Sequence, residues 1–452
     1  MSDPLELAQR LARDYLATVG ERAVSPTPEA IERLAELRTP VPDGPTDAAA
    51  VLASLDAIGS PATMASAGGR FFGFVTGASL PVAVGASWLA TAWDQNAAMS
   101  AMSPIAVALE RVVLEWLREL LLLPEGSAGA LVTGATMASF TALAAARRQL
   151  LARAGWNVDD DGLFGAPPLT VVVGEEVHVA VTKALGLLGL GRNRVVRVPA
   201  DGQGRLRADR LPRLDASTVV CAQAGNVNTG ACDPLGAICD AAAAAGAWVH
   251  VDGAFGLWAA AAPARAALVD GAARADSWAV DAHKWLNVPY DSGVAFVRDG
   301  AALYGAMTVP APYLTTGGAP EPCHATPEMS RRARAVEIWA ALRTLGRAGV
   351  AELVERACRH AARFAERLRA GGCEILNDVV LNQVLVAFGD DARTDAVVAA
   401  VQRDGTAWCG PTVWQGRRAM RISVSSWATS ETDVERVADT ILRCYDGASH
   451  KG

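Results

Sequence analysis

Two charged side chains, Asp252 and Lys284, stand at the ends of apolar runs, where an ordinary surface charge is not expected. Asp252 ends the run Trp-Val-His-Val-Asp, and Lys284 lies in Asp281-Ala-His-Lys-Trp, after another apolar run. A buried lysine amine is nucleophilic and forms an imine with a carbonyl compound. A buried carboxylate needs a cationic partner. Taken singly, Asp252 is more typical of a helix cap or a metal ligand, and Lys284 of a structural ion pair with Asp281.

Two further segments could bind an anion and an aromatic ring. The segment 134–139, Gly-Ala-Thr-Met-Ala-Ser, follows a β-like run and opens a helical stretch, so its backbone N–H groups form an anion site. His178 lies just after a strand and just before a helix. A histidine there is usually a cap or a core residue, but it can also place an imidazole flat on a ring.

These four signals together match the needs of one cofactor, pyridoxal phosphate (PLP). This cofactor requires a phosphate anchor, a group stacked on its ring, an amine for a Schiff base, and a carboxylate that keeps the pyridine nitrogen protonated. The chain presents the phosphate turn, His178, Asp252 and Lys284 in that order, each at the end of a predicted strand. Since open parallel sheets place their ligands at the carboxyl ends of strands, we predict a PLP enzyme with Lys284 as the Schiff-base residue.

The strands that position these residues are expected in one large α/β domain. Between about 105 and 300, β-rich runs alternate with helical or loop stretches, and several runs are almost wholly apolar, as in strands covered on both faces. Helical stretches at 139–152 and 235–246 favour a mostly parallel sheet. We predict seven strands at Ala130–Thr133, Leu169–Val173, Arg194–Val198, Thr218–Ala222, Trp248–Val251, Ser277–Val280 and Gly293–Val297.

Three domains are predicted, with boundaries near 60 and 330. Residues 1–60 read as a helical N-terminal segment, beginning with an amphipathic helix at 2–20, and residues 61–330 as the large domain. Residues 331–452 read as a smaller α+β domain. Its predicted elements are helices at Ser330–Leu345 and 351–370, strands at Glu374–Leu376, Val384–Phe388 and Met420–Val424, and a final helix near Thr429.

Composition excludes several other classes of protein. The chain has 452 residues with 51% hydrophobic and 20% charged residues, so a sizeable core is available and wholesale disorder is excluded. The net charge of −7 disfavours nucleic acid or an anionic membrane as the main partner. The eight cysteines form no zinc-binding pattern, so no metal is expected and buried thiols in a reducing cytoplasm are the better interpretation.

One uncharged segment, 71–93, is long enough to span a bilayer. Glycines at 73, 77 and 85, together with Pro81, interrupt it, so it lacks the sustained apolar character of a spanning helix. We interpret this segment as a loop and helix buried in a protein interface.

The chain resembles the group II PLP-dependent amino-acid decarboxylases of fold type I, over roughly residues 60–440. That family includes aromatic amino-acid, glutamate and diaminobutyrate decarboxylases. The most specific stretches are His250-Val-Asp-Gly-Ala254, Asp281-Ala-His-Lys-Trp285, Gly225-Asn-Val-Asn-Thr-Gly230 and Ser330-Arg-Arg-Ala-Arg-Ala-Val-Glu-Ile-Trp339.

The resemblance assigns roles to the cofactor site. It implies that Lys284 forms the Schiff base, that Asp252 pairs with the pyridine nitrogen, and that His178 stacks on the ring while Ala254 packs beneath it. The phosphate-binding residues implied are Ala135, Thr136 and His283.

The resemblance also implies a substrate site and an obligate homodimer whose active site lies at the interface. Arg421, on a predicted strand, matches a position that can bind the substrate carboxylate. Asn96 and Ala98 are expected to line the neighbour's pocket. Phe74 belongs to an aromatic cluster that would suit an apolar substrate, although such clusters more often serve packing. The substrate side chain does not follow from the sequence.

Two positions depart from the family pattern. Asn226 stands where the family usually has Thr, which changes a hydrogen bond near the phenolic oxygen of the cofactor. The segment before Ser330 lacks the Tyr that commonly protonates the substrate carbon after carbon dioxide leaves. His324 is a candidate for this acid, since its ordinary pKa suits proton transfer at neutral pH, but a loop histidine without a role is equally consistent. Tyr313 is a weaker substitute.

The predicted reaction is α-decarboxylation of an L-amino acid through a quinonoid intermediate, giving carbon dioxide and an amine. The main alternative keeps the cofactor site but diverts the chemistry, either to decarboxylation with oxidative deamination to an aldehyde or to carbon–carbon cleavage as a lyase or aldolase. A cofactor-free protein of the same fold is a third alternative.

Overall fold

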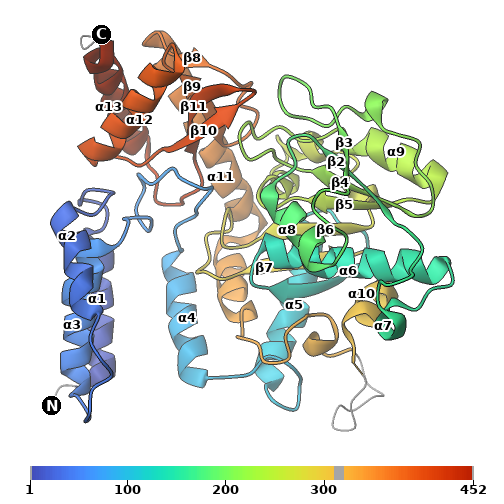
Figure 1. Ribbon diagram of the computed structural model, residues 1–452. Coiled ribbons are helices and arrows are strands. Elements are labelled where there is room, and N and C mark those ends of the chain that lie inside the picture. Colours follow the sequence, from blue (N-terminus) through green and yellow to red (C-terminus); the bar gives the residue numbers. More distant parts are fainter. Residues whose placement is uncertain (1–2, 310–319, 450–452) are drawn as a thin grey trace. The chain divides into compact units, whose positions relative to one another are not determined.

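The computed structural model describes residues 3–309 and 320–449 and divides the chain into two compact units (Figure 1). One unit contains residues 79–359 and 377–383. The other contains residues 1–78, 360–376 and 384–452. The second unit thus combines the N-terminal segment with the C-terminal part of the chain. The boundaries expected from the sequence at 60 and 330 stay a prediction.

A seven-stranded sheet forms the centre of the first unit, as predicted. Its order is β1-β7-β6-β5-β4-β2-β3, and all pairs are parallel except those that β7 makes with β1 and β6. Its strands are β1 Ala128–Val132, β2 Thr170–Gly174, β3 Val196–Val198, β4 Thr218–Gln223, β5 Trp248–Asp252, β6 Ser277–Asp281 and β7 Gly293–Val297.

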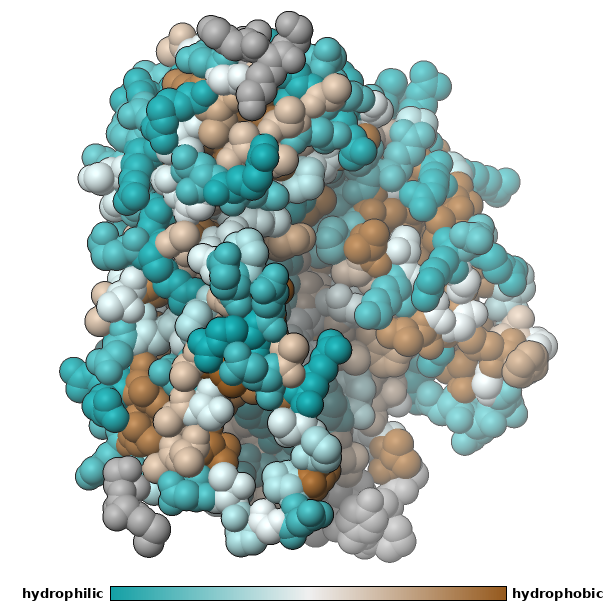
Figure 2. Space-filling view, turned by 60° about the vertical axis from the view of Figure 1, so that its left-hand side comes forward, coloured by the Kyte–Doolittle hydropathy of each residue, from teal (hydrophilic) through white to brown (hydrophobic). Residues whose placement is uncertain are grey.

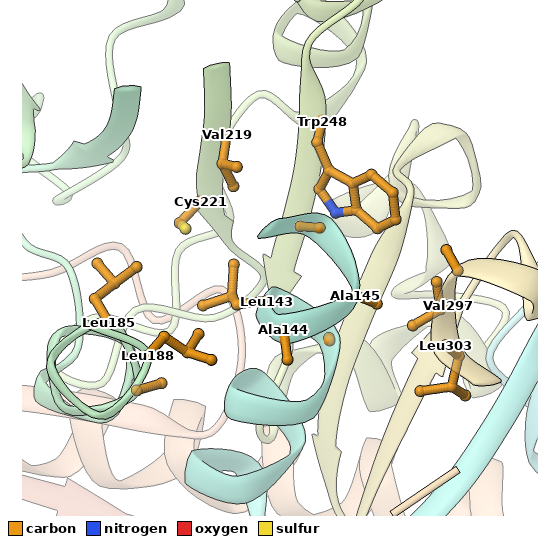
Figure 3. Packing of buried hydrophobic residues seen from close by; sticks show 14 of the residues in the cluster. Leu143, Ala144, Ala145, Leu185, Leu188, Val219, Cys221, Trp248, Val297 and Leu303 are labelled. Atoms are coloured by element: carbon orange, nitrogen blue, oxygen red, sulfur yellow. The ribbon is translucent and has the colours of Figure 1, made fainter. Parts of the chain in front are cut away.

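The core of this unit lies between the sheet and helices α6 Ala135–Arg153, α8 Val179–Leu187 and α10 Gly300–Met307. Helix α6 is buried along most of its length, because it packs on the sheet and between the other two helices. Figure 3 shows Leu143 and Ala144 of α6 in one cluster with Leu185 of α8 and Val219 of β4. Burial of each such leucine stabilises the fold by about 1.5–3 kcal/mol. This packing fixes the first turn of α6 against the sheet.

The helices of this unit surround the sheet or connect its strands. The α-helices are α4 Pro81–Trp93, α5 Pro104–Leu120, α6 Ala135–Arg153, α7 Val158–Asp161, α8 Val179–Leu187, α9 Leu235–Ala245 and α10 Gly300–Met307. The short 3-10 helices are η2 Ala208–Arg210, η3 Gly256–Ala261, η4 Ala266–Val269, η5 Ala272–Arg274 and η6 Pro322–His324.

The described part of the second unit contains three α-helices and one 3-10 helix near its N-terminus and a four-stranded antiparallel sheet of order β10-β11-β9-β8. Its helices are α1 Pro4–Thr18, α2 Pro28–Glu32, η1 Arg33–Leu37, α3 Ala48–Ala62, α12 Asp391–Asp404 and α13 Glu431–Ser449. Its strands are β8 Glu374–Ile375, β9 Gln383–Ala387, β10 Gly410–Trp414 and β11 Arg417–Ser423. The predicted first helix is confirmed, with Asp3 as its cap.

The helix predicted from Ser330 begins at Ala335 and belongs to α11, Ala335–Ala370, which joins the two predicted helices. Gly346 interrupts its helical backbone with φ 59° and ψ −177°, a conformation that a side chain would disfavour. Strand β10 was missed. It contains Pro411 and alternates buried with exposed residues, so it offers no continuous apolar run.

The uncharged 71–93 segment contains α4 and the irregular chain before it. Among the residues that the structure describes, no helix combines the length and the apolar character needed to cross a membrane.

Candidate active site

Five of the predicted residues lie at one edge of the seven-stranded sheet. Strands β1, β2, β4, β5 and β6 all run in the same direction, because β7 is antiparallel to both β1 and β6. Their carboxyl ends therefore meet at one edge. Ala135, His178 and Asn226 follow β1, β2 and β4, Asp252 ends β5, and Lys284 follows β6. The fold thus brings the four chemical signals of the sequence together.

Asp281, the last residue of β6, connects two of these residues. Its Oδ1 accepts a hydrogen bond of 2.6 Å from the backbone N–H of Ala135, at the N-terminus of α6. Its Oδ2 lies 2.9 Å from the Lys284 amine. The ion pair that the sequence left open is therefore present in the structure. Asp281 is 2% exposed, so both interactions are strengthened by the scarcity of water.

Two glycines allow the chain to pack tightly around Asp281. A Cβ at Gly293 would lie 2.4 Å from the Cα of Gly134, and a Cβ at Gly134 would lie 3.1 Å from the His283 ring. No larger residue fits between the start of β7 and the turn before α6. The close approach holds the α6 N-terminus next to the segment that carries Lys284.

His283 precedes the lysine and is held by its own hydrogen bond. Its Nδ1 accepts the backbone N–H of Ser292 at 3.1 Å, and its Nε2 lies 3.6 Å from Asp281 Oδ1. The ring of Tyr290 packs on the imidazole, with ring centroids 4.4 Å apart. Burial lowers the pKa of His283, although Asp281 opposes this effect. The neutral ring therefore carries its proton on Nε2, on the side of Asp281.

Asp252 is a buried carboxylate, 5% exposed, whose Oδ1 accepts the backbone N–H of Ala254 at 3.2 Å. Among the described residues, no Lys, Arg or His side chain pairs with it, and it belongs to no cluster of metal-binding side chains. Burial, with a smaller contribution from Asp252, raises the pKa of the nearby Cys221 thiol to about 12. That thiol stays neutral, so the carboxylate requires a cation from a ligand.

Asn226 organises the turn after β4 and keeps one donor unused. Its side-chain oxygen accepts the N–H groups of Asn228 and Thr229 at 2.9 and 3.2 Å. Its Nδ2 is buried and forms no hydrogen bond with the described residues. An unpaired buried donor costs about 1–3 kcal/mol, which a ligand oxygen would recover.

His178 is the N-cap of α8, and its Nδ1 accepts the backbone N–H of Ala180 at 3.2 Å. The helix-cap alternative is therefore present in the structure. This bond also fixes the orientation of the imidazole, which is compatible with stacking on a ring.

These residues fit pyridoxal phosphate. A cation is needed at Asp252, an acceptor is needed at Asn226, and an amine is available at Lys284. The pyridinium nitrogen, the phenolic oxygen and the aldehyde carbon of that cofactor have the complementary chemistry.

Two further predicted residues, His324 and Asn96, form hydrogen bonds with other parts of the chain. His324 Nδ1 accepts the N–H of Glu321 at 3.2 Å, and Asn96 Oδ1 accepts the N–H groups of Ala98 and Arg331, both at 3.1 Å. Tyr313 lies outside the described residues.

Phe74 and Arg421 belong to the second unit. Phe74 is 66% exposed and stacks on Trp408, with centroids 5.2 Å apart. Arg421 pairs with Gly410 in the β10–β11 ladder, and burial lowers the pKa of its guanidinium. Their expected substrate contacts stay predictions.

Sequence reasoning missed Arg331, which anchors the segment containing Asn96. The Arg331 guanidinium is buried, donates to the carbonyls of Ala97 and Leu131, and pairs with Glu110 at 2.8 Å. The signal was available in the Ser-Arg-Arg-Ala-Arg stretch, where Arg331 follows Ser330, but its partner Glu110 lies 221 residues away.

A cavity of about 550 Å³ lies elsewhere, among α1, α2 and α3. Its Arg22 donates to the carbonyls of Ser60, Pro61 and Thr63, which is a structural tie between helices. The chemistry of the sheet edge, rather than cavity size, identifies the candidate site.

Comparison with known proteins identifies the family and the fold that this chain resembles. Residues 28–389 match the pyridoxal-dependent decarboxylase conserved domain. Tryptophan decarboxylase 1 of Oryza sativa subsp. japonica is 28% identical over 83% of this chain and 80% of its own, and phenylacetaldehyde synthase of Arabidopsis thaliana is 26% identical over 81% and 76%. The crystal structure of Oryza sativa TDC with PLP and tryptamine matches with a TM-score of 0.91 and 25% identity, covering 98% of this chain and 97% of that one. The predicted fold type I is thereby confirmed.

Proposed function

Because the chain belongs to the pyridoxal-dependent decarboxylase family, we propose that it removes the α-carboxylate of an L-amino acid and releases carbon dioxide and an amine. The family and its cofactor make the chain a PLP-dependent carboxy-lyase. The observation that carries the proposal is the buried carboxylate of Asp252, without a cation of its own, on the strand next to the one that ends before Lys284.

The bound cofactor supplies an electron sink for the electron pair left on the substrate when its carboxylate leaves. Asp252 holds a positive charge at the pyridine nitrogen, because a buried carboxylate stabilises a cation that water would otherwise solvate. Lys284 provides the amine that attaches the cofactor. His178, fixed as a helix cap, would stack on the ring, and Ala254 would pack against the ring as well.

Several groups at the α6 N-terminus hold the phosphate. Ala135 and Thr136 lie in the first turn of α6, where the helix dipole favours an anion. The N–H of Ala135 is donated to Asp281, which leaves the N–H of Thr136 for the phosphate. His283 adds an Nε2–H donor on the same side. Asn226 donates its unused Nδ2–H to the phenolic oxygen.

For the substrate, we propose that Arg421 binds the carboxylate and that Phe74 and Asn96 contact the rest of the molecule. Arg421 lies on β11 and is partly desolvated, which favours pairing with a carboxylate. Too strong a pair would stabilise the ground state, so its task is to orient the bond that breaks.

A second function, decarboxylation with oxidative deamination to an aldehyde, is favoured by one observation. The segment 320–330 contains no Tyr, and His324 is the candidate acid there. A relative, phenylacetaldehyde synthase, is named for an aldehyde product. Carbon–carbon cleavage as a lyase or aldolase is the remaining outcome of diverted chemistry.

We also propose that the enzyme works as a homodimer. The apolar side chains of Val82, Trp88, Leu89 and Trp93 on α4 are 37–54% exposed, as expected for an interface helix. Figure 2 shows hydrophobic patches that interrupt the hydrophilic surface on the face it displays. All eight cysteines are free, which supports a location in the reducing cytoplasm.

The test is to incubate the PLP-loaded enzyme with a panel of L-amino acids while carbon dioxide, amine, aldehyde and oxygen are measured. Amine and carbon dioxide in equal amounts, without oxygen uptake, support the decarboxylase. Aldehyde with oxygen uptake favours the second function, and fragments without carbon dioxide contradict both.

A further inference from the structure

Asp281 contacts both the proposed phosphate turn and the lysine proposed to bind the cofactor. It is the last residue of β6, and it contacts both the N–H of Ala135, at 2.6 Å, and the amine of Lys284, at 2.9 Å. Neither role assigned so far requires a carboxylate there. Capping α6 needs only an acceptor, which a neutral amide would provide, and attachment of the cofactor needs only the amine.

The carboxylate of Asp281 forms an ion pair with the Lys284 amine at 2.9 Å. The carboxylate side chain is 3% exposed and the lysine side chain is 19% exposed, so their attraction is screened much less than at the surface. This attraction stabilises lysine as a free ammonium. A lysine bound to the cofactor has its nitrogen in a carbon–nitrogen double bond and loses most of this interaction.

We propose that Asp281 is a positioning residue that stabilises the free ammonium form of Lys284 and so promotes the exchange of this lysine for the amine of the substrate. The proposal rests on the proposed function for the role of Lys284. In the exchange, the carbon–nitrogen double bond to Lys284 is replaced by one to the substrate nitrogen. Two hydrogens pass from the substrate ammonium to the lysine nitrogen, which leaves as an ammonium and is bound by Asp281.

The position of Asp281 next to the phosphate turn also affects how tightly the cofactor is retained. Asp281 occupies the N–H of Ala135, the first donor of the phosphate turn, and its charge disfavours a second anion nearby. Loss of the charge alone should therefore leave cofactor retention equal or stronger. Slower exchange with undiminished retention is a combination that simple structural damage does not produce.

The matched variants are Asp281→Asn, Asp281→Ala and Asp276→Asn. Asparagine at 281 keeps an acceptor for Ala135 and removes the charge, whereas alanine removes both. Asp276 precedes the opposite end of β6, where its carboxylate accepts the N–H of Val249 at 2.8 Å, so its variant controls for the loss of a partly buried carboxylate next to this strand.

The first measurement is the rate at which hydroxylamine displaces Lys284 from the cofactor, which is monitored as the loss of visible absorbance. The second measurement is the amount of cofactor that stays bound to the protein after dialysis. We expect displacement to be at least tenfold slower in Asp281→Asn than in the wild type, with equal or greater retention, and Asp276→Asn to behave as the wild type.

The proposal would be overturned if Asp281→Asn showed the wild-type rate of displacement, so that only Asp281→Ala were slower. It would also be overturned if Asp276→Asn slowed the displacement as much as Asp281→Asn does. Failure of Asp281→Asn to retain the cofactor would overturn it as well. A wild-type protein that never acquires visible absorbance with PLP would instead refute the proposed function.

Discussion

The ring nitrogen Nε2 of His250 on β5 lies 3.3 Å from the hydroxyl of Ser139 on α6. The other ring nitrogen, Nδ1, lies 3.0 Å from the hydroxyl of Ser277 on β6, which also accepts the indole N–H of Trp248. His250 therefore ties α6 to two strands, two residues before Asp252. Because α6 begins at the turn proposed to bind the phosphate, this network couples both ends of the proposed cofactor site.

His250 makes the stability of the fold depend on pH. Burial lowers its pKa from 6.5 to about 3, so between these values the unfolded chain binds more protons than the folded one. The free energy of unfolding should fall as the pH drops through this window, by at most about 1.4 kcal/mol per pH unit. Denaturant unfolding between pH 4.5 and 7 should show a flatter dependence in His250→Gln. Parallel curves for the two proteins would contradict the assignment.

Lys284 should be the only lysine that binds the cofactor covalently. The chain contains just three lysines, at 183, 284 and 451, so borohydride reduction followed by peptide mapping gives an unambiguous result. We expect the label on the peptide with residue 284 and none in Lys284→Ala. The exposed Lys183 offers the control, since Lys183→Ala should label as the wild type does.

Asp252→Asn should retain the cofactor but lose activity. An amide cannot stabilise the positive pyridine nitrogen, so the electron sink weakens and kcat should fall by at least 100-fold, about 2.7 kcal/mol in the barrier. Absorbance of the lysine-bound cofactor and carbon dioxide release would be measured on the same samples. A variant with nearly normal kcat would show that the buried carboxylate has another role.

The site was largely predictable because its residues adjoin strong local signals. Asp252 ends one strand and Lys284 follows another, both buried throughout, and such mostly apolar runs are visible in the sequence. The contact of Asp281 with Ala135 was not predictable, since 146 residues separate them and only the sheet order brings β1 and β6 to either side of β7. Strand β10 was missed because its side chains are buried on one face only.

The buried pair of Arg331 and Glu110 should stabilise the fold strongly. Its side chains are 0% and 4% exposed, so Arg331→Ala leaves an uncompensated carboxylate and should lower the free energy of unfolding by about 3–5 kcal/mol. The exposed pair of Arg359 and Glu352, both 56% exposed, is the control, and Arg359→Ala should cost less than about 1 kcal/mol. Equal losses in the two variants, measured by denaturant unfolding, would contradict this difference.

His324 decides between the two candidate reactions if it is the acid that protonates the substrate carbon. Its Nδ1 accepts the N–H of Glu321, so its neutral ring carries the donor proton on Nε2. Replacement by Phe keeps an aromatic ring and removes that proton. His324→Phe should lower the rate of amine formation at least tenfold and raise the shares of aldehyde and oxygen uptake, because the carbanion then persists long enough to react with oxygen. Thr308→Val, which removes only a hydroxyl that donates to the His324 carbonyl, should keep the wild-type product ratio. An unchanged amine rate in His324→Phe would remove this residue from the mechanism and leave the proton to another donor.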